Sequence, residues 1–127
     1  MRILFADGHD NFRNVVANLL RDDGHEVHAV AHGGELVTVA RRIIPDVIVT
    51  HARFTDLPTL DALEYLVAAN VHVPIILMSG DAAGGLPHDE AVRLGVVAYL
   101  EKPFSMAALR EVLASATRTR RRIDIAS

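Results

Sequence analysis

Short apolar runs alternate with amphipathic segments five times along this chain, and no other feature limits its fold as strongly. The apolar runs cover residues 3–6, 25–31, 47–50, 74–78 and 96–100. Apolar side chains then recur at helical spacing over residues 12–20, 36–43, 60–66, 91–94 and 106–116. Runs of this length predict buried strands, and the helical spacing predicts helices that pack on one face. Gly24, Pro45 and Gly95 stand where three of these helices are expected to end.

Strands that are apolar on both faces are typical of a parallel sheet with helices on each side. Because crossovers between parallel strands are right-handed, the alternation predicts an α/β fold with a doubly wound, five-stranded parallel sheet. The chain has 127 residues, half of them hydrophobic, which is enough for the core of one domain. We therefore expect a single domain over residues 1–127, with a basic C-terminal tail over residues 118–127. A ligand site in such a sheet lies beyond the carboxyl ends of the strands.

Composition excludes several classes of protein. Thirteen Lys and Arg against sixteen Asp and Glu give a net charge of −3, which argues against nucleic acid as the main partner. The arginines of the tail are expected to form a solvated helix end. There is no cysteine, which excludes disulfides, cysteine-bound zinc and thiol nucleophiles. The first apolar run meets Asp7 too early for a signal peptide or a membrane span, so we expect a soluble, cytoplasmic protein without membrane contact.

Polar residues stand at four of the expected strand ends, namely Asp7, His51, Ser79 and Lys102. The segments around them, LFADGH (4–9), PDVIVTH (45–51) and YLEKPF (99–104), resemble the receiver domains of bacterial two-component response regulators. The resemblance covers essentially the whole chain. It implies a flavodoxin-like, CheY-like (βα)5 fold with strand order 2-1-3-4-5. It also implies an acidic pair that holds Mg²⁺ after the first strand and a phosphoacceptor Asp after the third. A hydroxyl and a lysine would contact the phosphoryl group, and a switch aromatic would lie on the fifth strand.

The sequence fills only part of this pattern. By the resemblance, Asp7 takes the first acidic place, Ser79 the hydroxyl, Lys102 the lysine and Tyr99 the switch aromatic. The second acidic place holds Gly8, and the phosphoacceptor place holds His51. Thr55 also stands where the family has a proline. The resemblance therefore predicts a degenerate pseudo-receiver.

Charge explains why these departures matter. A receiver of the usual kind brings three carboxylates against one ammonium, whereas Asp7 and Lys102 here sum to zero. Mg²⁺ prefers hard oxygen ligands, so His51 does not replace a carboxylate as its ligand. We expect weak or absent Mg²⁺ binding, no other cofactor and no aspartyl phosphate at the usual position. We also expect an Asp7–Lys102 ion pair with a structural role, although Asp7 alone is equally compatible with a helix cap.

Three interpretations are open for His51. It fills the vestigial pocket as a polar side chain, it joins Asp7 and His9 around a metal such as Zn²⁺, or it accepts phosphate itself. We favour the first interpretation, because the spacing matches no dedicated metal motif. The remaining histidines, at positions 25, 28, 32, 72 and 88, are expected to be solvated.

The function that follows is a stand-alone signalling domain that binds a histidine kinase, another response regulator or an effector protein. No nucleophile–base pair stands out, so we expect no enzymatic activity. One alternative keeps phosphorylation, with Asp10 or Asp56 as the group involved. A second alternative is a metal- or small-ligand-binding protein on the same fold.

An interaction surface is also expected on the fifth strand and the last helix. Its residues are Tyr99, Ala107, Ala108 and Glu111, and the small alanines suit a homodimer. Tyr99 is equally compatible with a place in the core. The glycine-rich segment 79–85 predicts a pliable loop, and residues 84–87 predict a frayed start of the fourth helix.

Overall fold

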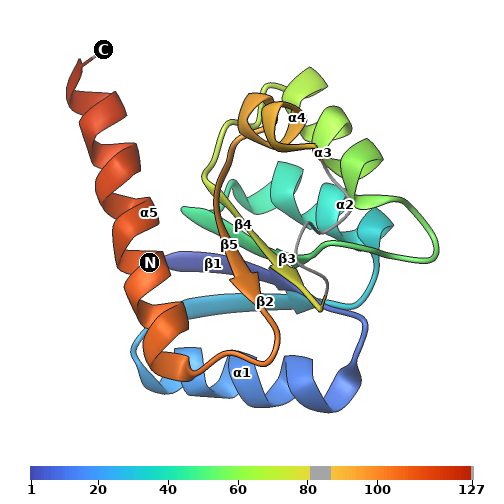
Figure 1. Cartoon of the computed structure of the whole chain (residues 1–127), viewed down its shortest axis with the longest axis vertical. Coiled ribbons are helices and arrows are strands. Elements are labelled where there is room, and N and C mark those ends of the chain that lie inside the picture. Colours follow the sequence, from blue (N-terminus) through green and yellow to red (C-terminus); the bar gives the residue numbers. More distant parts are fainter. Residues whose placement is uncertain (81–86, 127) are drawn as a thin grey trace.

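The computed structural model contains five strands and five helices in strict alternation (Figure 1). The strands are β1 (Arg2–Ala6), β2 (Glu26–Val30), β3 (Val47–His51), β4 (Ile75–Ser79) and β5 (Val96–Glu101). The helices are α1 (Asp10–Asp22), α2 (Gly33–Ile43), α3 (Thr59–Ala68), α4 (His88–Arg93) and α5 (Met106–Ala126). The structure describes residues 1–80 and 87–126, with side chains described as far as Arg118. The elements expected from the periodicity are all present.

All the strands are parallel and lie in the order β2-β1-β3-β4-β5. This confirms the predicted doubly wound sheet. β1 and β3 are neighbours in the centre, and their register pairs Ile3 with Val47 and Ala6 with Thr50. The direction of winding reverses between these two strands, so the loops that follow them open a crevice at one edge of the sheet.

Helices cover both faces of the sheet, as Figure 1 shows. Side chains of α2, α3 and α4 pack on one face around Leu36, Leu63 and Leu77. Those of α1 and α5 pack on the other around Phe5 and Leu109. Because the central strands contribute to both clusters, they are buried on both faces, which explains why their sequences are apolar throughout.

The basic C-terminal tail is part of the last helix. Its arginines were expected to form a helix end, and α5 continues to Ala126, with its last turns extending past the sheet in Figure 1. Arginine favours helix, so the backbone continues after the apolar stripe has ended. Arg118 is exposed, as expected. The pliable loop and frayed helix start expected over residues 79–87 fall mainly on residues 81–86, which lie outside the described residues.

Two of the outlying histidines are less solvated than expected. Three of them, at positions 32, 72 and 88, are exposed as predicted. His25 is half-buried, with its Nδ1 3.1 Å from the amino-terminal nitrogen of Met1. His28 is also half-buried and places its Nε2 2.9 Å from Glu26 Oε2. The chain terminus supplies the partner of His25, and the first residue of β2 supplies that of His28, which lies on the same strand.

Candidate functional site

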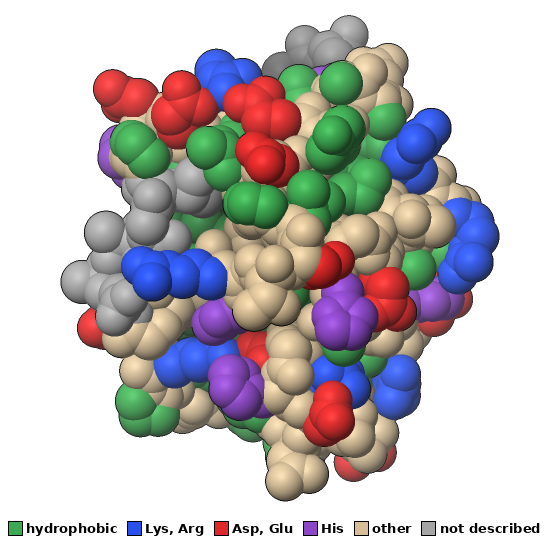
Figure 2. Space-filling view, turned by 90° about the vertical axis from the view of Figure 1, so that its right-hand side faces the viewer, with side chains coloured by type: hydrophobic (Ala, Val, Ile, Leu, Met, Phe, Trp, Pro, Cys, Tyr) green, Lys and Arg blue, Asp and Glu red, His purple; other side chains and the backbone are tan. Residues whose placement is uncertain are grey.

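The carboxyl ends of the strands meet at the edge shown in Figure 2, where histidine side chains gather among basic and acidic ones. Asp7 follows β1 directly, and none of its surface is exposed. Its Oδ1 accepts a hydrogen bond from the backbone N–H of His9 at 2.8 Å. Its Oδ2 lies 2.6 Å from Lys102 Nζ, which reaches it from the end of β5. The predicted ion pair is therefore present.

An aromatic ring covers the lysine of this pair. The Nζ atom of Lys102 lies 4.4 Å from the centroid of the Phe12 ring, close enough for a cation–π contact. Phe12 in turn packs edge-on against Phe104, with ring centroids 5.8 Å apart. The ammonium is thus held between a buried carboxylate and an aromatic face.

The pKa of Asp7 lies below its usual value. Burial acts in the opposite direction and is the largest single influence, but the hydrogen bonds from Lys102 and from the His9 amide outweigh it. Asp7 is therefore ionised at neutral pH. Its charge is balanced within the protein by Lys102.

His51, in the phosphoacceptor place, is the last residue of β3 and is partly buried. Its Nδ1 atom lies 3.9 Å from Asp7 Oδ2 and has no hydrogen-bond partner within the described part of the chain. Its ring meets those of His9 and Phe54 edge-on, with centroid distances of 6.3 and 6.1 Å. Burial, followed by the charge of Lys102, keeps the pKa of His51 below its usual value, so the imidazole is neutral at pH 7.

The magnesium ion implied by the resemblance does not fit these residues. Of the three carboxylates that the family pattern supplies, only that of Asp7 is present, and both its oxygens already have partners in His9 and Lys102. Gly8 adds no side-chain oxygen, and the nitrogens of His51 are poor ligands for Mg²⁺. A cation at this point would also face the ammonium of Lys102 at close range.

The alternative metal set of Asp7, His9 and His51 is not assembled either. The Nδ1 atom of His9 lies 3.2 Å from Asp7 Oδ1, as in a hydrogen bond rather than around a shared ion. Among the residues that the structure describes, no three His, Asp or Glu side chains converge in a way that could hold a metal ion.

The two other aspartates considered for phosphorylation have different partners. Asp10 is largely exposed and accepts a hydrogen bond from Arg13 at 2.8 Å. Asp56 accepts hydrogen bonds at 3.0 Å from the backbone amides of Gly33 and Gly34, the first residues of α2. These amide bonds hold the pKa of Asp56 below its usual value. Asp56 therefore caps a helix from a distant loop.

Ser79, in the hydroxyl place, lies at the edge of the sheet where Asp7 and Lys102 meet. Ser79 is buried at the end of β4, and its carbonyl accepts a hydrogen bond from the Lys102 amide at 2.7 Å. Tyr99 is 42% exposed, which decides between the two interpretations in favour of the surface. Ala107 and Glu111 are exposed on α5, whereas Ala108 is half-buried and packs against the core.

Sequence reasoning missed two parts of the site. Phe12 was assigned only to the core face of α1, although its ring also covers Lys102. Arg13 was not singled out, yet its Nη1 atom donates to the carbonyl of Asp7 at 2.9 Å. Both lie in the first turn of α1, one turn from the end of β1. Their closeness in sequence to Asp7 was the signal that could have assigned them to the site.

Comparison with known proteins identifies the family of this fold. The family model of the response regulator receiver domain matches residues 3–114. Chemotaxis protein CheY-3 of Vibrio cholerae is 30% identical over 116 residues, which cover 89% of this chain and 88% of that protein. Regulatory protein AtoC of Escherichia coli is 29% identical over 112 residues, and the chain spans 88% of its own length but only 24% of AtoC. Two other curated relatives are likewise covered only to 32% and 47%.

A solved structure shows the same fold with a metal. It is the receiver domain of a sensor histidine kinase from Pseudomonas aeruginosa, which holds magnesium in its own active site cleft. It is 29% identical, has a TM-score of 0.80, and the match covers 91% of this chain and 96% of that one. Within residues 1–80 and 87–126, none of the helices has the length and apolar character needed to cross a bilayer. Matched over most of its length by the family model, the chain belongs to the response regulator receiver domain family.

Proposed function

We propose that this receiver domain takes part in two-component signalling through protein contacts and is not phosphorylated at position 51. Its proposed partner is a histidine kinase, another response regulator or an effector protein in the bacterial cytoplasm. The domain itself catalyses no reaction in this proposal. Mg²⁺ binds weakly or not at all, and no other cofactor is required.

The ion pair between Lys102 and Asp7 carries this proposal. At 2.6 Å, the ammonium neutralises the one buried carboxylate of the cleft. Formation of an aspartyl phosphate needs a cation that offsets the negative charge developing on the phosphate oxygens, and a carboxylate oxygen that accepts the group. The neutral Asp7–Lys102 pair disfavours binding of the cation. The accepting oxygen is missing, because the side chain of His51 offers nitrogen atoms only.

The surface proposed for the partner lies on α4, β5 and α5. Val92, Val97 and Tyr99 are all more than 40% exposed there, which is unusual for large apolar side chains at neighbouring positions. Ala107 and Glu111 extend the surface onto α5. A second copy of the chain is one partner that this surface would accept.

Phosphorylation is tested directly on the whole chain. Incubation with acetyl phosphate and Mg²⁺, followed by intact-mass measurement, is expected to leave the mass unchanged. Amide NMR spectra with beryllofluoride are expected to show no shifts around β3. A stoichiometric phosphoryl adduct would falsify the proposal, and loss of that adduct in Asp10→Asn or Asp56→Asn would identify the acceptor.

A restored variant makes the negative result informative. The double substitution Gly8→Asp with His51→Asp returns the two missing carboxylates. A side chain fits at position 8, because a Cβ atom there would meet only the Ala31 carbonyl at 3.6 Å. We expect this variant to bind Mg²⁺ and to accept phosphate, with Ser79 and Lys102 already at their strand ends. Failure of the restored variant as well would mean that loss of the two carboxylates is not the reason for inactivity.

A further inference from the structure

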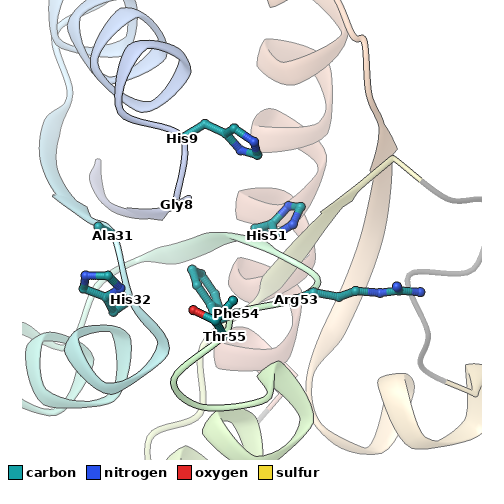
Figure 3. Close-up of a pocket in the computed structure, with 8 residues that line it drawn as sticks. All are labelled: Gly8, His9, Ala31, His32, His51, Arg53, Phe54 and Thr55. Carbon is teal, nitrogen blue, oxygen red and sulfur yellow. The ribbon is translucent and has the colours of Figure 1, made fainter.

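A cavity of about 430 Å³ opens beside the acidic cleft. Its wall comes from the loops that follow β1, β2 and β3, as the close-up in Figure 3 shows. Eight residues form it, namely Gly8, His9, Ala31, His32, His51, Arg53, Phe54 and Thr55. The volume lies in the range of pockets that hold small organic molecules and exceeds what a bare phosphate ion needs.

Most polar side chains of this wall carry nitrogen atoms that can donate hydrogen bonds. Three of the wall residues are histidines, namely His9 and His32 from the loops after β1 and β2, and His51 at the end of β3. Arg53 also lines the wall, but Figure 3 shows its side chain extending away from the histidines. There is no Asp or Glu among the eight wall residues. Imidazole groups that line a wall without a carboxylate favour an anionic ligand, because they can donate hydrogen bonds to it.

Three of the carboxylates near the wall have partners elsewhere. The carboxylate of Asp7 is buried against Lys102, at 2.6 Å. That of Asp10 is paired with Arg13, and that of Asp56 caps α2 through the amides of Gly33 and Gly34. The carboxylate of Glu35 accepts a hydrogen bond from the backbone amide of Ala31 at 3.4 Å. Because position 8 is a glycine, it adds no negative charge to the described residues of the wall.

The rest of the wall favours a flat ring. Phe54 lines the cavity, and Figure 3 shows its ring on the same side of the cavity as Thr55, with His51 between it and His9. The rings of Phe54 and His51 lie edge to face, at 83° and 6.1 Å between centroids. An aromatic ligand can contact both of them, because aromatic groups pack well at such angles and distances. Ala31 and Gly8 present no bulk that would prevent its entry.

We propose that this cavity binds a small aromatic acid, with a carboxylate or a phosphate as its acidic group. This goes beyond the protein-contact function proposed above, since it gives the domain a chemical input that is independent of phosphorylation. The ligand would contact the segments that follow β1, β2 and β3, so its binding would restrict their movement.

The first experiment is a titration of the whole chain followed by amide NMR, with four probes. Benzoate and phenyl phosphate carry both a ring and an acid and are expected to shift the amides of Gly8, His32 and Arg53 in a saturable way. Acetate lacks the ring and benzamide lacks the charge, so both are expected to bind at least about fivefold more weakly. Comparison of benzoate with phenyl phosphate decides which acidic group is preferred. Equal binding of all four probes, or no saturable shift, overturns the proposal.

Matched variants test the charge argument. Gly8→Asp and Gly8→Asn add side chains of the same size to the wall, but only the first adds a negative charge. We expect the aspartate variant to bind benzoate roughly three- to tenfold more weakly than the asparagine variant. Equal affinities of the two variants contradict an anion site.

A second pair of variants does not depend on filling the cavity. His32→Asn removes an imidazole from the wall while keeping a residue that suits the start of α2. His88→Asn removes an equally exposed imidazole on α4 as the control. Benzoate binding is expected to weaken in the first variant alone. Unchanged binding in His32→Asn refutes the assignment of this wall. Phosphorylation of the wild-type chain is measured separately, so failure of either proposal is recognised independently.

Discussion

Replacing Lys102 by methionine removes the ammonium from Asp7 while keeping an unbranched side chain of similar length. The carboxylate of Asp7 has no exposed surface, and it would keep only its contacts with His9. Removing one partner of a buried pair costs about 3–5 kcal/mol, because the other charge stays buried without compensation. Lys102 is itself 19% exposed, so water can partly replace the ammonium. We therefore expect about 3 kcal/mol at pH 7, at the lower end of that range.

The cost should depend on pH with a definite sign. In the wild-type protein the pKa of Asp7 is lowered, so the ionised carboxylate contributes stability above its unfolded pKa, and this is lost as the pH falls through the folded pKa. Without Lys102, burial dominates and the folded pKa of Asp7 rises. The stability gap between Lys102→Met and wild type should then narrow as the pH falls below the raised pKa of Asp7, where its carboxylate becomes protonated.

Urea unfolding followed by circular dichroism measures both effects, since the chain contains no Trp. For a domain of this size, 3 kcal/mol corresponds to a fall in Tm of about 10 °C. The matched variant is Asp7→Asn combined with Lys102→Met, which removes both charges and should be more stable than Lys102→Met alone by about 2 kcal/mol. A cost below about 1 kcal/mol, or a gap that does not change with pH, would refute the internal neutralisation of Asp7.

Three further changes test other contacts. Gly33→Ala places a Cβ atom 2.6 Å from the Leu57 carbonyl and should cost about 2 kcal/mol in urea unfolding, whereas Gly8→Ala meets nothing closer than 3.6 Å and should be tolerated. Asp56→Ala removes the cap of α2 and should lower the urea midpoint of unfolding, with faster amide exchange at the start of that helix. His51 has a lowered folded pKa, so its contribution to stability is full above pH of about 6.5 and falls as the pH drops below it. His51→Phe should make the stability curve flatter between neutral and mildly acidic pH, and an unchanged slope would contradict a buried neutral imidazole.

The fold could be predicted from the sequence because its signals are local. Strands such as β3 and β4 are buried on both faces, and so their apolar runs are uninterrupted. The end of α2 was also readable, because Pro45 prevents the helix from continuing past Ile44. The exact end of α5 was not readable. The arginines after Thr117 predicted a helix end, but the apolar periodicity stops at Ala116 and gives no signal for the point at which the helix ends, Ala126.

Contacts in the candidate site could be predicted only between residues at strand ends, because the order of the strands alone brings those residues together. Parallel strands bring the residues after β1 and β5 to one edge, and a lysine beside a lone carboxylate at that edge forms an ion pair, as Asp7 and Lys102 do. Asp56 shows the limit of this reasoning. Its distance in sequence from Gly33 gives no hint that it caps α2, because that contact depends on the path of the β3–α3 loop. Its place in a loop after the third strand made Asp56 a candidate for phosphorylation, whereas in the structure its carboxylate is bound to the amides of Gly33 and Gly34. Because the same local charge serves either role, only the three-dimensional partner of each carboxylate decides whether it is available for chemistry.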